Sequence, residues 1–290
     1  MSSTSSAGPL RLTLIAALSP SNGLGVSGGL AWSLKGEMAY FRKATSFVPP
    51  SSHPAAGVET KGKAKNAVIM GRNTWESIPP KFRPLKGRIN VVVSRTTGEE
   101  REKELGISAS QDAYLVSSLP SAISLLQSFP SAFADTSDEP SKPLLARTFL
   151  IGGAQLYAQA LQSLTRSQEL DQAKNKEDAV LDRMLITRLL APEHNECDVF
   201  LPEYRTASQI QEDATLLPSA SQPSEADRNS NGAGGQEQEP LAEAQWHKES
   251  HEILQRFLGP EKVQAGIVTE GEGQKETKYE FQLWSLKGQL

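Results

Sequence analysis

The chain of 290 residues has a single cysteine, Cys197, so no disulfide bond can form within it. One cysteine in this length favours a reducing compartment, and we expect a cytoplasmic protein, with a nuclear or mitochondrial pool left open. Because Asp198 and then apolar residues follow it, Cys197 is more typical of core or loop packing than of a nucleophile. No apolar run approaches the length that spans a membrane.

Neither sign of charge is in large excess, and apolar residues are few. The formal net charge is −4, and no basic patch of the kind that binds nucleic acid or an anionic membrane is present. A hydrophobic fraction of 38% is low for a globular chain and indicates that part of the chain does not fold. We expect a Ser-rich disordered tail over 1–10 and one domain over 11–290. Polar insertions fall near 49–65, 165–180 and 205–245, and the last is acidic and predicted to be disordered.

The most informative stretch runs from Asn66 to Ser94. An apolar run at 67–70 is followed by a short helical pattern at 75–78, two prolines, and a largely β-branched run at 89–93. This order predicts a strand, crossover helix, strand unit of a parallel sheet covered on both faces. Further strands are expected at 12–18, 148–151 and 182–190, with helices at 33–45, 117–129 and 154–161. Residues 96–106 look loop-like.

Glycines, hydroxyls and arginines follow these strands. Gly71, Arg72 and Thr74 stand after the first, and Ser94 and Arg95 after the second. Because parallel strands end at one edge of the sheet, this pattern predicts a ligand with more than one phosphate. The alternative is two surface arginines beside a turn. The Gly-Gly pair at 152–153 indicates either a second anion cradle at a helix N-terminus or only a tight turn.

A loop with four glycines, 19–30, follows the first strand and lacks the G-x-G-x-x-G pattern of a Rossmann domain. It is predicted to be a lid or a segment that hugs a ligand. Trp32 ends this loop, and Leu34, Met38 and Phe41 then form the apolar stripe of a helix with Glu37 beside it. A carboxylate there is costly to bury unless something binds it, and an exposed glutamate is the alternative. Near the end of the chain, 245–250 and 278–284 are predicted to form an antiparallel hairpin at the sheet edge.

Taken in order, these strings resemble dihydrofolate reductase, and TWESIP in particular is similar to its fungal members. The resemblance rests on the loop that ends in Trp32, on Glu37 with Tyr40-Phe41-Arg42, and on NAVIMGRNTWESIPPKFRPLKGRINVVVSR, FLIGGAQLY and CDVFLPE. It covers 12–284 apart from the insertions. Ala31 departs from it, since proline commonly precedes the tryptophan in this family.

The resemblance implies an α/β, single-domain fold with a predominantly parallel sheet, an antiparallel C-terminal edge hairpin and flanking helices. It also implies NADPH-dependent reduction of 7,8-dihydrofolate to 5,6,7,8-tetrahydrofolate, which serves thymidylate, purine and one-carbon metabolism. Hydride would pass from C4 of the nicotinamide to C6 of the substrate, with N5 protonated. The protein would be a monomer that binds antifolate inhibitors, with no metal, membrane or obligate nucleic-acid partner.

By resemblance, the catalytic residues are Glu37, which would bind the pterin 2-amino group and N3, Thr187, which would support it, and Trp32, which would hold a water. Arg88 would grip the substrate's glutamate tail. The substrate-binding set is Ile15, Glu37, Met38, Phe41, Arg42, Ile78, Phe82, Leu85, Arg88, Ile151 and Tyr157. The cofactor-binding set is Ala17, Leu24, Gly25, Gly71, Arg72, Asn73, Thr74, Ser94, Arg95, Thr96, Gly152, Gly153, Ala154, Gln155, Leu156 and Tyr157.

Two other functions remain alternatives at this point. A pyrimidine reductase of riboflavin synthesis would share the fold and NADPH, but it would need neither Glu37 nor Arg88. A catalytically silent module that binds NADPH or folate would be signalled by loss of Trp32 or Glu37, and both are present.

Overall fold

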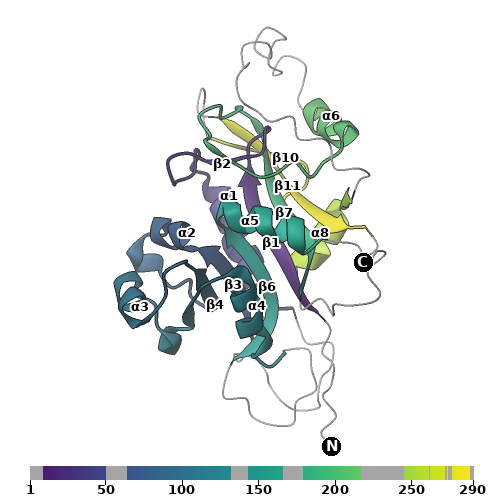
Figure 1. The fold of residues 1–290 in the computed structure, drawn as a ribbon. Coiled ribbons are helices and arrows are strands. Elements are labelled where there is room, and N and C mark those ends of the chain that lie inside the picture. Colours follow the sequence, from purple (N-terminus) through teal and green to yellow (C-terminus); the bar gives the residue numbers. More distant parts are fainter. Residues whose placement is uncertain are drawn as a thin grey trace, which may run out of the picture.

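The computed structural model describes residues 9–49, 64–131, 143–165, 179–216, 245–260, 262–271, 273 and 276–287. In these residues nine strands form one sheet, in the order β10-β11-β7-β1-β6-β3-β4-β5, with β9 also paired to β11 (Figure 1). Its strands are β1 (Leu10–Leu18), β3 (Ala64–Gly71), β4 (Arg88–Val93), β5 (Ala113–Val116), β6 (Leu144–Gly152), β7 (Ala179–Ala191), β9 (Trp246–Lys248), β10 (Ile267–Glu270) and β11 (Thr277–Leu286). A separate two-stranded sheet pairs β2 (Gly23–Gly25) with β8 (Val199–Phe200).

Every pairing from β7 across to β5 is parallel, whereas β11 is antiparallel to β7, β9 and β10. The helices are α1 (Lys35–Ser46), α2 (Arg72–Ser77), α3 (Glu99–Leu105), α4 (Leu119–Gln127), α5 (Ala154–Ser163), α6 (Ala207–Thr215) and α8 (His251–Leu258), with 3-10 turns η1 (Pro80–Phe82) and η2 (Ala109–Gln111). The predicted α/β fold with a predominantly parallel sheet is confirmed.

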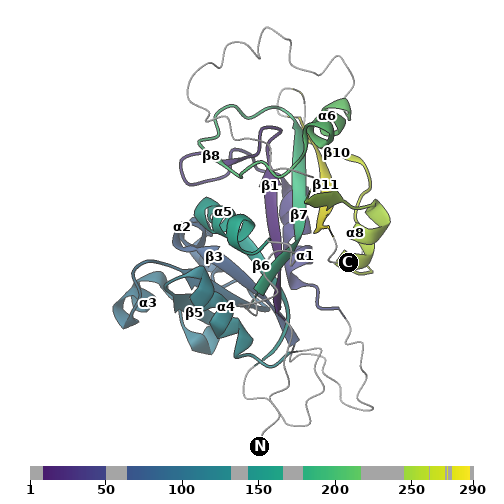
Figure 2. The same ribbon diagram turned by 45° about the vertical axis from the view of Figure 1, so that its right-hand side comes forward.

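Helices cover both faces of the parallel part of the sheet (Figures 1 and 2). On one face, apolar residues of α4 and α5 pack against alternate strand residues, including Leu12 and Leu14 of β1. On the other face, α1, α2 and α8 pack against the strand residues between them, including Ile15. Burial on both faces explains why these strands appear in the sequence as unbroken apolar runs.

The register of the parallel strands brings three strand ends together. Gly71, the last residue of β3, pairs with Val93 at the end of β4, and Met70 pairs with Gly152 at the end of β6. The segments that begin with Arg72, Ser94 and Gly153 therefore leave the sheet side by side. The predicted strand, crossover helix, strand unit is confirmed.

Several predictions about the outer elements are wrong. Residues 96–106 are not a loop, because α3 lies within them. The two C-terminal strands do pair antiparallel, as β9 and β11, but α8 and β10 come between them, so the hairpin is β10-β11. The insertion predicted to be disordered from 205 begins with α6, which a capping box at Thr206 and Gln209 initiates. Residues 1–8, 50–63, 166–178 and 217–244 lie outside the described residues.

Candidate active site

Glu37 lies in the first turn of α1 and is only 6% exposed. Its carboxylate forms no hydrogen bond and no ion pair within the part of the chain that the structure describes. Burial, and to a smaller degree the charge of Glu270, raise the pKa of Glu37 to about 7. The alternative of an exposed glutamate flanking the helix is therefore wrong, and Glu37 is a buried carboxylate without a partner among the described residues.

The buried face of α1 is shifted by about one residue from the apolar stripe that the sequence predicts. Glu37, Tyr40 and Ala44 are buried, whereas Met38 is 53% exposed. The prediction followed the apolar residue types, but the helix turns its carboxylate inward and leaves Met38 outside. Burying an unpaired charge is costly, so the buried carboxylate of Glu37 needs a compensating interaction.

Trp32 is buried directly before α1, and its indole Nε1 has no hydrogen-bond partner among the described residues. Its ring lies 5.2 Å from that of His194, with the ring planes tilted by 58°. Cys197 is buried in the same small cluster, which confirms it as a packing residue. An indole N–H enclosed without an acceptor indicates room for a ligand atom or a water beside it.

The glycine loop between β1 and α1 is fastened at its base and exposed toward its tip. Gly23 and Gly25 pair with β8, and the Asp198 amide donates to the Gly25 carbonyl at 3.0 Å. A Cβ at Gly25 would lie 2.1 Å from the Gly29 carbonyl oxygen, so only glycine fits there. Leu24, between the two paired glycines, is half-buried.

Apolar side chains from five segments pack in the core layer that contains α1. Ile15 of β1 and Ile151 of β6 are buried in this layer, and Phe41, Ile78 and Leu85 pack against the layer while partly exposed. The hydroxyl of Tyr157, on α5, donates to the Ile15 carbonyl at 2.8 Å. The charge of Glu37 contributes to raising the pKa of Tyr157, so the carboxylate lies within electrostatic reach of this pair.

Thr187 is buried in β7, where it pairs with Ala17 of β1 on one side and with Phe281 of β11 on the other. Its hydroxyl forms no hydrogen bond within the described segments. The structure therefore places Thr187 at the centre of the sheet without showing the predicted support of Glu37. Phe82 is 56% exposed on η1, and Arg42 is exposed on α1.

Arg88 begins β4 and is 7% exposed. Its Nη1 donates to Thr45 Oγ1 at 2.7 Å, and its Nε donates to the Lys86 carbonyl at 3.3 Å. It forms no ion pair with a described residue, and burial together with the charge of Arg42 lowers its pKa to about 10. A buried guanidinium with a second cation nearby and no carboxylate partner suits the carboxylate of a ligand.

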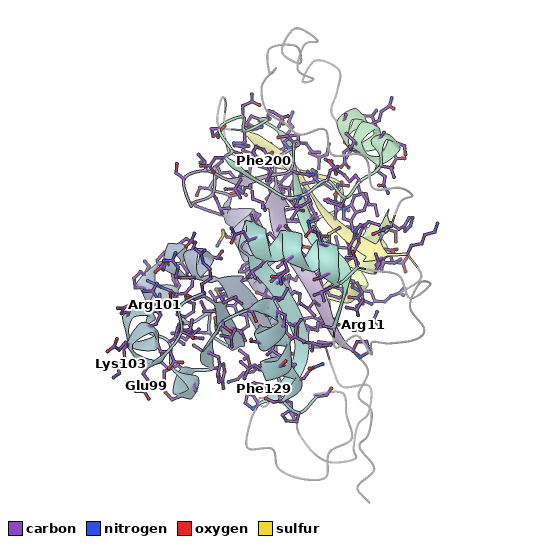
Figure 3. All side chains as sticks on the ribbon, viewed as in Figure 1. Arg11, Glu99, Arg101, Lys103, Phe129 and Phe200 are labelled. Carbon is purple, nitrogen blue, oxygen red and sulfur yellow. The ribbon has the colours of Figure 1, made fainter. Side chains whose placement is uncertain are left out.

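At the shared strand ends, a hollow of about 240 Å³ has a strongly cationic lining of Arg72, Ser94, Arg95, Thr96 and Arg101. The first four of these are predicted from the sequence, whereas Arg101 is not; it comes from α3, on the left of Figure 3. Arg101 and Arg72 both pair with Glu76, at 3.4 and 3.3 Å. The prediction of a loop over 96–106 gives no reason to connect Arg101 with this hollow.

Glycines allow the ends of β3 and β6 to approach each other closely. A Cβ at Gly71 would lie 3.7 Å from Gly153 Cα, and one at Gly152 would lie 2.7 Å from the Thr74 side chain. Gly153 has a φ of 94° and stands just before α5, which begins Ala154-Gln155-Leu156 and has no side-chain cap. The N-terminus of α5 therefore keeps backbone N–H groups available beside a tight turn, as an anion cradle requires. Asn73 is exposed on α2.

A second buried charged cluster joins the base of the glycine loop to α6. Arg188, which is 1% exposed, donates to the Ser19 carbonyl, to Asn22 Oδ1 and to the Tyr204 hydroxyl. Arg205 donates to Asp213 at 2.9 Å. Since most of these groups satisfy one another, the cluster is structural.

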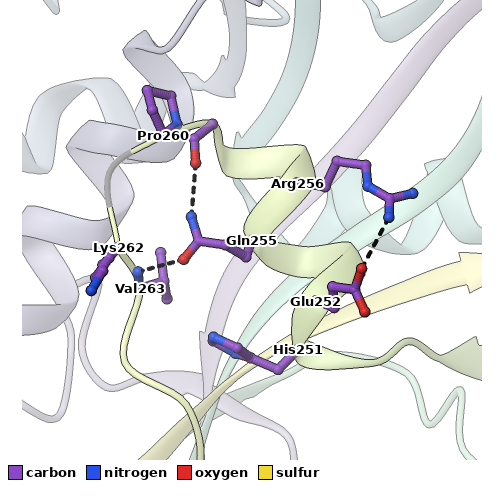
Figure 4. A pocket seen from close by; sticks show the side chains of 8 residues that line it. His251, Glu252, Gln255, Arg256, Pro260, Lys262 and Val263 are labelled. Atoms are coloured by element: carbon purple, nitrogen blue, oxygen red, sulfur yellow. Dashed lines mark hydrogen bonds and ion pairs between the residues drawn. The ribbon is translucent and has the colours of Figure 1, made fainter.

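A larger hollow of about 570 Å³ lies on the other side of the molecule, along α8 and the turn after it (Figure 4). Gln255 spans it, donating to the Gly259 carbonyl at 2.7 Å and accepting from the Val263 amide at 2.9 Å. Arg256 pairs with Glu252 on the helix surface. These polar groups are satisfied by the protein, and none of the predicted site residues lines this hollow. No helix in the described part of the chain is long and apolar enough to cross a membrane.

Comparisons with known proteins agree with this geometry. A family model described as dihydrofolate reductase matches residues 59–215. Dihydrofolate reductase of Cryptococcus neoformans var. neoformans serotype D is 36% identical over 212 residues, which cover 70% of this chain and 79% of that protein. The Pneumocystis carinii enzyme of the same name is 34% identical over 275 residues, which cover 94% of this chain and 96% of that protein.

The solved structure of Schistosoma mansoni dihydrofolate reductase has a TM-score of 0.52 at 24% identity, and the match covers 96% of this chain and 100% of that one. It shows a shared fold. The alignment with the Pneumocystis carinii protein covers 94% of this chain, so Trp32 and Glu37 lie within it. Because the family model matches more than half of the chain, and the Cryptococcus and Pneumocystis proteins are 36% and 34% identical to it, the chain belongs to the dihydrofolate reductase family.

Proposed function

We propose that this protein catalyses the NADPH-dependent reduction of 7,8-dihydrofolate to 5,6,7,8-tetrahydrofolate. The observation that carries the proposal is Glu37, a buried carboxylate without a partner in the described chain, which follows by five residues Trp32, whose buried indole N–H also lacks one. A pterin supplies what the carboxylate lacks, since its 2-amino group and N3 donate hydrogen bonds. Binding of this ring offsets the cost of burying Glu37.

The rings and the glutamate tail of the substrate would each contact complementary residues of the protein. Phe41 and Ile78, partly exposed on the core layer of α1, would enclose the pterin and benzoyl rings, with Leu85 and Phe82 further along. Arg88 would bind the α-carboxylate of the glutamate tail, because it is buried and has no acidic partner among the described residues. Antifolate inhibitors would occupy the same positions.

The residues at the strand ends fit NADPH. Arg72, Arg95 and Arg101, with Ser94 and Thr96, form a cationic hollow that suits the adenosine 2′-phosphate. Gly71, Gly152 and Gly153 leave space that a Cβ would fill, so backbone can approach the pyrophosphate next to Thr74 and the N-terminus of α5. Ala17 and Leu24 would contact the nicotinamide. NADPH supplies the hydride, and the protein orients the rings and excludes water.

Protonation of Glu37 sets the expected pH dependence. Its pKa of about 7 means that the carboxyl group holds a proton in acid and loses it as the pH rises through neutrality. Reduction of dihydrofolate takes up a proton at N5, and we propose that this proton reaches N5 from solvent through a water held by Trp32 near the pterin. The rate is therefore expected to fall as the pH rises through about 7.

The test is the loss of NADPH absorbance when 7,8-dihydrofolate is added to the purified protein. We expect rapid oxidation of NADPH, slower oxidation of NADH, and a decrease of roughly 10²-fold or more in turnover for Glu37→Ala. Glu276→Gln, which alters an exposed carboxylate in the C-terminal hairpin, serves as the matched control and should retain wild-type turnover. Near-normal turnover in Glu37→Ala at neutral pH would remove Glu37 from the site.

We further propose that the enzyme is a cytoplasmic monomer of one-carbon metabolism whose polar insertions do not take part in catalysis. Its single cysteine supports the reducing compartment. Deletion of 217–244 with unchanged turnover is the expected result. A large loss of turnover in a folded deletion variant would assign those residues a catalytic part.

A further inference from the structure

We propose that Glu270, at the end of β10, is a positioning residue that holds the N-terminus of α1 and sets the protonation state of Glu37 through its own charge. The inference rests on the proposed function, since it concerns the carboxylate assigned to the pterin. Glu270 lies on the C-terminal hairpin, far from Glu37 in the sequence, and would take part in controlling the reaction.

The contact is made through backbone amides of α1. Glu270 Oε1 accepts from the Lys35 amide at 2.5 Å, and Oε2 accepts from the Gly36 amide at 3.0 Å and from the Tyr279 hydroxyl at 3.1 Å. The residue at the N-cap position of α1 is Leu34, which has no side chain able to cap. Glu270 therefore satisfies two free amides of the helix in place of a local cap.

The fit between the hairpin and the helix is close. A Cβ at Gly36 would lie 2.6 Å from the Tyr279 hydroxyl and 2.9 Å from Glu270 Oε2. Glycine at this position lets the carboxylate of Glu270 reach the helix end itself, one residue before Glu37. The hairpin β10-β11 thus fixes the first turn of α1, from which Glu37 projects.

The ionisable groups that interact electrostatically with Glu37 come from four elements. They are Tyr40 of α1 itself, Tyr157 of α5, Tyr279 of β11 and Glu270 of β10. Burial raises the pKa of all three tyrosines further above neutrality, so these hydroxyls stay uncharged. Glu270 is then the charged member of the set, and in the described part of the chain no cation pairs with it or with Glu37.

Two effects of Glu270 act in the same direction. Its negative charge repels a second negative charge on Glu37. It also occupies the Lys35 and Gly36 amides, which would otherwise favour an anion in the first turn of the helix. Both effects keep the proton on Glu37 up to a higher pH than burial alone.

The experiment measures the titration of Glu37 directly, by carboxyl ¹³C NMR of glutamate-labelled protein without ligands, with the resonance assigned from Glu37→Gln. Glu270→Gln removes the charge and keeps a hydrogen-bond acceptor, whereas Glu270→Asp keeps the charge on a shorter side chain. Glu276→Gln removes an equal charge from the same hairpin, at an exposed position beside Lys278. The pH profile of dihydrofolate reduction is recorded for each variant.

We expect Glu270→Gln to lower the Glu37 midpoint by on the order of half a pH unit or more, in both NMR and rate. Glu270→Asp and Glu276→Gln should stay near wild type. In the wild type, added salt should lower the midpoint only slightly, because salt screens a partly buried pair much less than an exposed one. An unchanged midpoint in folded Glu270→Gln, or an equal decrease of the midpoint in Glu276→Gln, would overturn the proposal. An NMR shift in a protein that does not reduce dihydrofolate would uphold the coupling and reject the proposed function.

Discussion

Two acidic side chains are buried to nearly the same degree, Glu37 at 6% exposure and Asp213 at 7%, but their surroundings are opposite. Asp213 accepts hydrogen bonds from Arg205 at 2.9 Å and from Gln282 at 3.2 Å, and Lys248 lies 3.6 Å away. Glu37 has no such partner among the described residues, and the charge that raises its pKa is the negative one of Glu270.

The difference separates a carboxylate that the fold itself satisfies from one that the described residues leave without a partner. A buried carboxylate surrounded by donors is satisfied within the fold, so removing it leaves cations unpaired and costs stability. A buried carboxylate without donors costs stability while it is ionised, and that cost is offset only when a ligand binds. Variants at the two positions should therefore change stability in opposite directions.

The largest effects are expected at these two buried carboxylates, and the first variant is Asp213→Asn. The substitution leaves Arg205 and Arg188 buried with one negative charge fewer, so the free energy of unfolding should fall by about 3 kcal/mol. Urea denaturation of this variant is compared with that of Glu212→Gln, whose side chain is exposed on the same helix. If both variants unfolded at the same urea concentration, the cluster would not be structural.

Glu37→Gln should raise stability, and only above acidic pH. The folded-state pKa of about 7 lies above the ordinary value of 4.5, so the unfolded chain loses this proton first and wild-type stability declines as the pH rises from 4.5 through 7. Relative to wild type, the variant should gain about 3 kcal/mol at about pH 8 and little at about pH 5. Urea midpoints at the two pH values measure this, and a gain independent of pH would contradict titration of Glu37 as its cause.

Arg88→Leu should weaken dihydrofolate binding about 10- to 100-fold, the loss expected for hydrogen bonds between charged groups. An inhibitor that carries the pterin ring but no glutamate tail should bind almost as tightly as to wild type. Dissociation constants for both ligands are compared with those of Arg256→Leu, which is exposed on α8. Equal losses for the two ligands would show that Arg88 acts on the fold and not on the tail.

The smallest effect is expected from Arg101→Ala. Its guanidinium shares the cationic hollow with Arg72 and Arg95, so its loss should reduce the preference for NADPH over NADH by on the order of tenfold, with NADH kinetics unchanged. Lys103→Ala on the same helix is the control. A preference equal to that of wild type would limit the phosphate site to the residues that follow β3 and β4.

The sequence was sufficient for the central sheet because both faces of its strands are covered. Runs such as 67–70 and 89–93 are apolar throughout or nearly so, and their pairing follows from the short crossover. Gly71, Arg72, Ser94 and Arg95 could be brought together for the same reason, since parallel strands end at one edge. The family resemblance supplied the roles of Glu37 and Arg88, which composition and spacing alone left undecided.

The missed elements are short or depend on distant contacts. The polar helix α3 offers no apolar stripe, and only Leu105 of it is buried. Glu270 caps α1 from 235 residues away, so no local pattern reveals that contact. Met38 was placed in the core because it is apolar, whereas the helix buries Glu37 instead. These errors lie where tertiary contacts or a ligand override local preference.

The strand order also has a consequence for biosynthesis. β1 is made first, but both of its neighbours, β6 and β7, begin more than a hundred residues later, whereas β3, β4 and β5 can pair among themselves as they appear. At ~10 residues per second, β6 leaves the ribosome roughly ten seconds after β1. During that interval β1, which carries Ile15, has no neighbouring strand to pair with, so its apolar residues stay open to non-native contacts until β6 is made.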